Sequence, residues 1–227
     1  RYTGDTKKLI DSAQSNPLRT KCHLIQREDS IGSIPCIYFD GEPKVAVLGN
    51  SHGAELAYAL ANLLKKNKIS VVHHTMSGCF HNYNKNDEKE SVCYLWHENV
   101  VETLIKDQTI ETIIISYRNE KYLKNNLYRK SLTDMIQKLS EEGKEVVLVL
   151  QAPLAGADIQ KYINIALKTS KNNLIGITRS EWRKIYYAQN QLIDELPDKI
   201  KIIDPADFLC DNKNCYVIRD GEALYFD

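Results

Sequence analysis

The chain has 227 residues and a mass of 26.0 kDa, which suits one well-filled domain or two small ones. Its 30 Lys and Arg residues balance 30 Asp and Glu residues, so the formal net charge is zero. Nucleic-acid-binding proteins usually carry a basic excess, and we therefore expect no nucleic-acid partner. A hydrophobic content of 43% and a charged content of 26% argue against disorder and against a coiled coil.

No apolar run in the sequence is long enough to span a bilayer. The first residues, RYTGD, also lack the apolar core of a signal peptide. We interpret the sequence as an excised domain or a mature form.

Six cysteines fall into three pairs of near neighbours in the sequence, at positions 22 and 36, 79 and 93, and 210 and 215. Six cysteines allow 15 pairings, and we propose Cys22–Cys36, Cys79–Cys93 and Cys210–Cys215 because each closes a short loop. Zinc is the competing interpretation, but only positions 210 and 215 come near the spacing of a zinc knuckle. Disulfides indicate an oxidising compartment such as the periplasm, the cell surface or a secretory lumen.

Apolar strands and amphipathic helices are predicted to alternate along the chain. Residues 1–43 show no strong periodicity and are interpreted as an extension packed on a domain that covers residues 44–227. Strands are predicted over residues 44–49, 69–74, 109–117, 146–150 and 200–203. Helices are predicted over residues 51–67, 95–106, 127–140, 159–167 and 181–196, with a polar loop over 82–90. This order predicts an α/β protein, a three-layer α/β/α sandwich with a mostly parallel five-stranded sheet.

Functional sites in such sheets lie at the carboxyl ends of the strands, and the first strand ends in GNSHG at residues 49–53. A serine at a strand-to-helix turn is exposed and has backbone N–H donors beside it, which suits Ser51 as a nucleophile. Taken alone, a serine at this position is more often an ordinary helix N-cap. A phosphate-binding loop is excluded because the G-x-x-x-x-G-K-[ST] pattern is missing.

The segment LGNSH at residues 48–52 resembles the first block of the SGNH hydrolase superfamily. The chain is most similar to the SGNH domains fused to bacterial membrane acyltransferases that O-acylate cell-envelope glycans. Three later segments extend the resemblance in order: CYLWHEN at 93–99, IISYRN at 114–119 and GEALYFD at 221–227. It spans about residues 40–227 and implies an SGNH or flavodoxin-like fold.

The resemblance implies a role for several residues. Ser51 would be the acyl-accepting nucleophile, and the backbone N–H groups of Ser51 and Gly78 would form the oxyanion hole. Asn119, or its neighbour Arg118, stands where a third donor is expected. Asp227 would orient the histidine base.

The sequence departs from the family pattern in three places. Asn50 replaces the usual aspartate, and we expect it to keep the turn because an amide oxygen can accept a local backbone hydrogen bond. The third block is not a clean G-x-N-D, which affects the assignment of Asn119. The histidine base is expected three residues beyond Asp227, the last residue of this sequence.

Other candidate residues have simpler interpretations. A metal site from His73, His81 and His97 is the alternative to separate core or solvated histidines. His73 and His74 lie on a strand, so we expect one to face the core and the other a helix or solvent. His52 follows the nucleophile and suits the polar start of a helix. Four aromatic residues are candidates for stacking on sugar or for core packing: Trp96, Trp182, Tyr186 and Tyr187.

The resemblance therefore implies the extracytoplasmic domain of an O-acyltransferase, without a cofactor or a bound metal. It would transfer an acetyl or similar short acyl group through an acyl-serine to a hydroxyl of a cell-envelope polysaccharide, such as O-antigen, lipopolysaccharide or peptidoglycan. The partners would be that polysaccharide and an N-terminal integral-membrane domain that supplies the acyl group. The domain would lie at the periplasmic or extracytoplasmic face, tethered to the bacterial inner membrane. The alternatives are a carbohydrate esterase or deacetylase, and a glycan-binding domain that has lost its base.

Overall fold

A computed structural model describes residues 4–80 and 88–226 of the chain. In the helix that follows the gap, side chains are described from residue 92 onward. These residues form two compact units. The larger unit contains Asn16–Gln151 and Ala188–Ile203, and the smaller unit contains Arg1–Ser15, Ala152–Tyr187 and Asp204–Asp227. The units are defined by which residues contact one another within the fold. The domain boundary that the sequence placed between residues 43 and 44 stays a prediction.

The larger unit is built on a six-stranded sheet in the order β1-β3-β2-β4-β5-β7. Five of its strands run parallel, as predicted: β2 (Glu42–Gly49), β3 (Ile69–Thr75), β4 (Thr112–Ser116), β5 (Glu145–Val149) and β7 (Lys201–Ile203). The sixth, β1 (Cys36–Tyr38), pairs antiparallel with β3 and falls in the predicted extension. A three-residue strand is too short to show a hydrophobic period, which is why the prediction of five strands was wrong by one.

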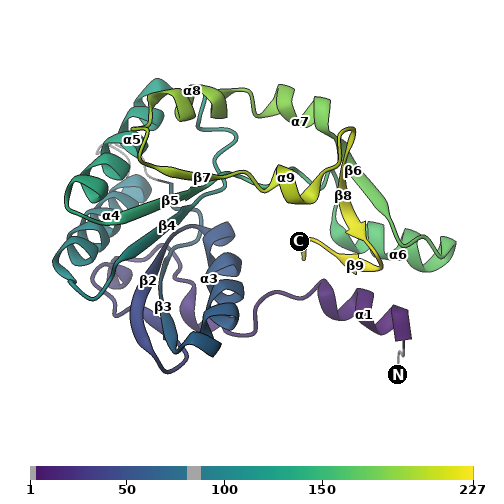
Figure 1. Cartoon of the computed structure of the whole chain (residues 1–227), viewed down its shortest axis with the longest axis horizontal. Helices are drawn as coiled ribbons and strands as arrows, with labels where there is room; N and C mark the ends of the chain where they lie inside the picture. The colour runs from purple at the N-terminus through teal and green to yellow at the C-terminus, as the bar shows by residue number, and fades with distance from the viewer. Residues whose placement is uncertain (1–3, 81–87, 227) are drawn as a thin grey trace. The chain divides into compact units, whose positions relative to one another are not determined.

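Helices lie on both faces of this sheet, giving the predicted α/β/α arrangement (Figure 1). The helix α3 (Ser51–Leu64) packs on β2 and β3, while α5 (Asn126–Glu141) packs on β5 and contacts α4 (Glu88–Lys106) and α8 (Ala188–Glu195). Short helical turns complete the unit: α2 (Arg19–Cys22), η1 (Glu28–Ser30) and η2 (Lys65–Asn67).

Small and branched side chains explain how α3 packs on the sheet. Ala54, Ala57 and Ala61 are fully buried and recur at helical spacing, so one face of α3 can approach the strands closely. The strands present fully buried apolar residues to their neighbours, among them Val47 in β2 and Val71 in β3. Apolar β-branched strands with both faces covered are typical of a parallel sheet.

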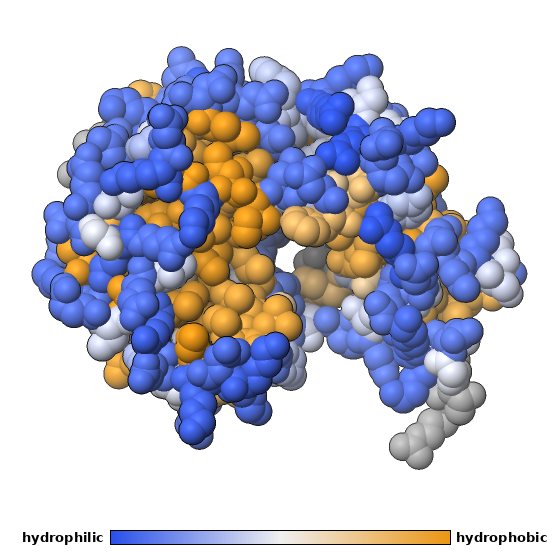
Figure 2. Space-filling view, viewed as in Figure 1, coloured by the Kyte–Doolittle hydropathy of each residue, from blue (hydrophilic) through white to orange (hydrophobic). Residues whose placement is uncertain are grey.

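Some apolar side chains remain exposed on the same side of the sheet as α3. Leu63 in α3 is 67% exposed and Ile203 in β7 is 42% exposed, while Val147 and Val149 in β5 are partly exposed. Figure 2 shows apolar residues gathered over this part of the larger unit, around α3 and β7. The covering of this face by helices is therefore less complete than that of the face under α5.

The smaller unit is formed by segments that are far apart in the sequence. Its antiparallel sheet has the order β6-β8-β9, and its elements are α1 (Gly4–Ser12), α6 (Ile159–Thr169), β6 (Leu174–Thr178), α7 (Arg179–Ile185), α9 (Ala206–Leu209), β8 (Asn214–Arg219) and β9 (Glu222–Ala223). Its core packs α1 and α6 against β8.

The single helix predicted over residues 181–196 is wrong, because the structure has two helices there. Thr178 and Glu181 form a capping box that starts α7, and α7 ends at Ile185. The second helix, α8, begins at Ala188 and belongs to the larger unit. The apolar spacing continues across this break, so periodicity alone does not show it.

Three disulfide bonds join the cysteines in the pairs that were proposed from the sequence: Cys22–Cys36, Cys79–Cys93 and Cys210–Cys215. The first two lie in the larger unit and the third in the smaller unit. Within the described ranges, no helix is both long and apolar enough to cross a bilayer.

Candidate functional site

Ser51 is the first residue of α3 and follows the end of β2 after a single intervening residue. Its side chain is at the amino end of a 14-residue helix, where the first backbone N–H groups have no partner within the helix. Ser51 is partly exposed, so a substrate can reach it. This location provides both a reachable hydroxyl and nearby hydrogen-bond donors for a negative charge.

Glycines on either side of Ser51 allow this turn to lie directly against β4. A Cβ atom at Gly49 would lie 1.9 Å from the carbonyl oxygen of Ser116, the residue paired with it in β4. A Cβ atom at Gly53 would lie 3.1 Å from the same oxygen and 3.2 Å from the Thr75 methyl group. The glycines of the GNSHG segment are therefore required by close backbone approach, most strictly at position 49.

Asn50 holds the turn to the segment that follows β4. Its side chain is buried, and its Oδ1 atom accepts hydrogen bonds from the backbone N–H of His52 at 3.3 Å and of Arg118 at 3.0 Å. Its Nδ2 atom donates to the Arg118 carbonyl at 3.3 Å. The expected local backbone bond is thus present, and the amide nitrogen adds a contact that an aspartate could not make.

The other two predicted oxyanion residues follow strands on either side of β2. Gly78 comes three residues after β3 and has a φ of +64°, while Asn119 comes three residues after β4 and is 4% exposed. Since the sheet order is β3-β2-β4, Ser51, Gly78 and Asn119 all follow the carboxyl ends of adjacent strands. Their roles in stabilising an oxyanion stay predictions.

Gln151 is a contributor that the sequence analysis did not assign. It lies two residues after β5 and is buried, and its Oε1 atom accepts hydrogen bonds from the backbone N–H of Asn119 at 2.8 Å and of Glu120 at 2.9 Å. It thereby fixes the start of the loop that carries Asn119. Its place at a strand's carboxyl end was a signal, but its partners are more than thirty residues away in the sequence.

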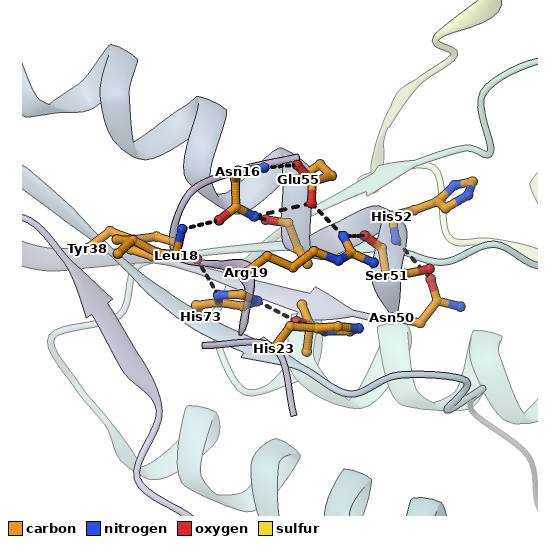
Figure 3. Close-up of polar contacts among 12 residues, drawn as sticks. Asn16, Leu18, Arg19, His23, Tyr38, Asn50, Ser51, His52, Glu55 and His73 are labelled. Carbon is orange, nitrogen blue, oxygen red and sulfur yellow. Dashed lines mark hydrogen bonds and ion pairs between the residues drawn. The ribbon is translucent and has the colours of Figure 1, made fainter. Parts of the chain in front are cut away.

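A cluster of polar side chains, formed by Asn16, Arg19 and Glu55, lies beside Ser51 (Figure 3). Arg19 forms an ion pair with Glu55 of α3 and donates to the Ser51 carbonyl at 3.5 Å. Asn16 donates from its backbone N–H to Glu55 at 2.8 Å and from its side chain to the Ala54 carbonyl at 3.1 Å. The His52 side chain points away from this cluster. Asn16 and Arg19 come from the predicted extension, and no motif marked them.

A chain of hydrogen-bonded side chains, all buried except the partly exposed His23, lies beside the end of β3. The Tyr38 hydroxyl is 2.7 Å from His73 Nδ1, the other ring nitrogen of His73 contacts the Thr75 hydroxyl, and the same hydroxyl lies 2.7 Å from His23 Nδ1. Burial lowers the pKa of His73 to about 3 and of His23 to about 4, and the positive charge of Arg19 adds to both shifts. Both imidazoles are therefore neutral at neutral pH.

Two further histidines are buried. His74 follows His73 on β3 and is 6% exposed, so of the two predicted alternatives, a helix or solvent, solvent is excluded. Burial lowers the pKa of His74 to about 4. His97 is also buried, 2.8 Å from the Cys93 carbonyl and 2.7 Å from the Tyr117 hydroxyl. His81 lies outside the described residues. Among the residues that are described, no group of three or more His, Cys, Asp or Glu could hold a metal ion.

Three of the four candidate sugar-stacking residues belong to the core. Trp96, Trp182 and Tyr186 are each 2% exposed, whereas Tyr187 is 51% exposed. Of the four, only Tyr187 presents a ring to solvent. Asp227, the residue predicted to orient a histidine base, lies outside the described residues.

Comparisons with known proteins agree with this architecture. A model of the family described as "SGNH domain (fused to AT3 domains)" matches residues 21–227. A search of curated proteins found no match. The fold is similar to the lipopolysaccharide acetyltransferase periplasmic domain of Salmonella ser. Paratyphi A, with a TM-score of 0.63 and 19% identity over 94% of this chain and 87% of that chain.

Two further solved structures are more distant. A GDSL-like lipase of Bacteroides thetaiotaomicron has a TM-score of 0.42 and 14% identity, covering 79% of this chain and 78% of that one. A catalytic mutant of an acetylxylan esterase from Geobacillus stearothermophilus has a TM-score of 0.39 and 14% identity, covering 70% and 74%.

Proposed function

We propose that this chain, which belongs to the family of SGNH domains fused to AT3 domains, transfers an acetyl or similar short acyl group to a hydroxyl of a cell-envelope polysaccharide. The observation that carries the proposal is the position of Ser51. It stands partly exposed at the amino end of α3, between two strand ends that carry Gly78 and Asn119. The likeness of the fold to a lipopolysaccharide acetyltransferase periplasmic domain supports the choice of acyl chemistry.

The reaction proceeds in two steps through an acyl-serine. The Ser51 hydroxyl oxygen attacks the acyl carbonyl while a histidine base, oriented by Asp227, takes the hydroxyl proton. The negative charge on the carbonyl oxygen is stabilised by the backbone N–H groups of Ser51 and Gly78 and by the Asn119 amide. The intermediate collapses to the acyl-serine as the donor group leaves with a proton. A sugar hydroxyl then attacks the ester carbonyl and gives its proton to the base, which passes a proton to Ser51 Oγ as the serine leaves, so that the sugar ester and the free Ser51 hydroxyl are formed.

The acyl donor reaches this domain from the AT3 domain, which we place N-terminal to this segment and within the bacterial inner membrane. The three disulfide bonds support a periplasmic or other extracytoplasmic location, because disulfides persist where the environment is oxidising. The acceptor is a hydroxyl of O-antigen, lipopolysaccharide or peptidoglycan at the same face of the membrane.

The test is covalent labelling of the full-length protein with a fluorophosphonate, followed by peptide mass spectrometry. We expect an adduct on Ser51, its loss in Ser51→Ala, and no change in Ser180→Ala, which alters an exposed serine of the smaller unit. We also expect Asp227→Asn to slow labelling. Absence of any adduct on Ser51 would favour a glycan-binding domain.

A second measurement separates transfer from hydrolysis. Membranes that contain the full-length protein and an acyl donor are incubated with envelope polysaccharide, and the ester content of the polysaccharide is measured. An increase that depends on Ser51 supports transfer. Release of free acetate from an acetylated polysaccharide, without any increase in ester, would instead make the protein an esterase.

A further inference from the structure

The first two turns of the nucleophile helix are held by a segment that precedes the sheet. Asn16 is 7% exposed and contacts Glu55 through its backbone N–H at 2.8 Å and through its side-chain amide at 3.2 Å. The same amide donates to the Ala54 carbonyl at 3.1 Å. Arg19 pairs with Glu55 and reaches the Ser51 carbonyl at 3.5 Å. Figure 3 shows the guanidinium between Glu55 and Ser51.

The segment that carries these residues is anchored to the sheet. The Cys22–Cys36 disulfide links it to β1, and Leu24 forms a bridge with Met76 directly after β3. Leu24 donates to the Thr75 carbonyl at 3.0 Å and accepts from the Ser77 N–H at 2.7 Å. Both anchors follow Arg19 closely in the sequence, so covalent and backbone contacts hold the segment that presents Arg19 to α3, with less ordering entropy left to lose than on a free loop.

Charge balance is the second property of this cluster. Glu55 lies four residues after Ser51 on the same helix, and its negative charge would oppose a second negative charge forming near Ser51. Arg19 supplies the opposite charge, and the two side chains are 21% and 26% exposed, so solvent only partly screens them.

The fields of both charges reach neighbouring groups. Burial is the largest cause of the pKa shifts of His23 and Tyr38. In addition, the positive charge of Arg19 lowers the pKa of His23, and the negative charge of Glu55 raises the pKa of Tyr38. A charge that alters the titration of these neighbours also acts on an oxyanion formed next to the amino end of α3.

We propose that Arg19 and Asn16 are positioning residues for Ser51: both hold the first turns of α3, and Arg19 also neutralises Glu55 while negative charge develops at the acylation site. This inference rests on the proposed function of Ser51. Arg19 acts through the Ser51 carbonyl and through Glu55, and it has no contact with the reacting acyl group in this assignment.

The test measures the rate of fluorophosphonate labelling of Ser51 in the full-length protein. Arg19→Gln leaves Glu55 uncompensated, and we expect labelling to slow by about tenfold. Glu55→Gln leaves the positive charge, and we expect labelling at least as fast as in the wild type. In the double variant the charges are again balanced, and we expect most of the lost rate to return. Arg129→Gln, which breaks the Arg129–Glu195 ion pair elsewhere in the same unit, is the matched control.

Each outcome separates this inference from the proposed function. If Ser51 of the wild type is not labelled, the proposed function fails and this inference fails with it. If the wild type is labelled and Arg19→Gln reacts at the same rate, only the inference is overturned. It is also overturned if both single variants slow labelling equally and the double variant shows no recovery. Melting temperatures of all variants identify any loss of rate that follows from unfolding.

Discussion

Mild acid should destabilise the larger unit through its buried histidines. His73 is 1% exposed and His74 is 6% exposed, and burial is the largest cause that lowers their pKa values, to about 3 and about 4. In the unfolded chain both titrate near their ordinary value of 6.5. Because the folded-state pKa is the lower one, the unfolded state binds more protons between these values. Stability from these groups is therefore complete above about pH 6.5 and is lost as the pH falls toward about 4 for His74 and about 3 for His73.

The size of the effect follows from the pKa differences. At pH 5 an unfolded-chain histidine is almost fully protonated while His73 and His74 are still neutral in the fold. Each histidine then contributes a loss of about 2 kcal/mol relative to pH 7, at about 1.4 kcal/mol for each pKa unit. His73 is also lowered by the neighbouring charges of His23 and His74, so the two losses are not independent, and we expect a total of about 2–4 kcal/mol.

Urea denaturation at pH 7 and at pH 5 measures this difference. Trp96 lies in the larger unit and Trp182 in the smaller, so Trp182→Phe leaves Trp96 as the fluorescence reporter for the unit that holds the histidines. Within the described residues the Trp182 indole N–H has no hydrogen-bond partner, so this replacement removes no such bond. Most carboxyl groups stay ionised from pH 7 to pH 5, because their usual pKa values are near 4.

A variant isolates the histidine contribution from other effects. His74→Leu removes one titrating group and keeps a side chain of similar size, so the change in unfolding free energy between pH 7 and pH 5 should shrink by about 2 kcal/mol. Equal unfolding free energies at both pH values in the wild-type background would refute the reasoning. So would an unchanged pH dependence in His74→Leu.

Two further predictions concern the turn that carries Ser51. Gly49→Ala should prevent stable folding of the larger unit, because its Cβ would lie 1.9 Å from the Ser116 carbonyl oxygen. Gly53→Ala, whose Cβ would come no closer than 3.1 Å to that oxygen, should lower the melting temperature much less. Equal melting temperatures of the two variants would contradict this prediction. Asn50→Asp introduces the residue usual in the family but places a carboxylate against the Arg118 carbonyl, to which the Asn50 amide donates. We expect the free energy of unfolding, measured by urea denaturation at pH 7, to fall by about 1–3 kcal/mol, and to fall less once the carboxyl is protonated. Greater stability in the variant would show that the amide donor contributes nothing.

Local patterns in the sequence were sufficient to predict the central part of the fold. The apolar run at residues 45–48 and the run at 113–115 predicted buried parallel strands, and the fully buried Val47, Ile113 and Ile115 lie in β2 and β4. Such strands are recognisable because covering both faces of a sheet requires continuous apolar residues. The change of period after Gly49 located the turn at Ser51, and neighbouring cysteines indicated the disulfide pairs because short loops bring their ends together easily.

Contacts between distant segments could not be predicted in this way. Arg19 and Glu55 are 36 residues apart, and Gln151 lies 32 residues from Asn119. A charged or polar side chain has no periodic signature, and its partner depends on which strands become neighbours. The sequence left open whether the second histidine of β3 would face a helix or solvent, because alternation shows only that successive residues face opposite sides; the packing decided that His73 and His74 are both buried.

The sequence by itself determined that this protein is an α/β domain with a serine at a strand-to-helix turn and cysteines placed for short disulfide loops. Only the tertiary structure decided that the predicted extension contributes β1 to the sheet and supplies Asn16 and Arg19 to the helix of Ser51. It also decided that a separate three-stranded sheet forms from segments on both sides of α8. The physical reason is that hydrophobic periodicity reports the burial of one element at a time, whereas strand order and side-chain partners follow from how the whole chain buries its elements together.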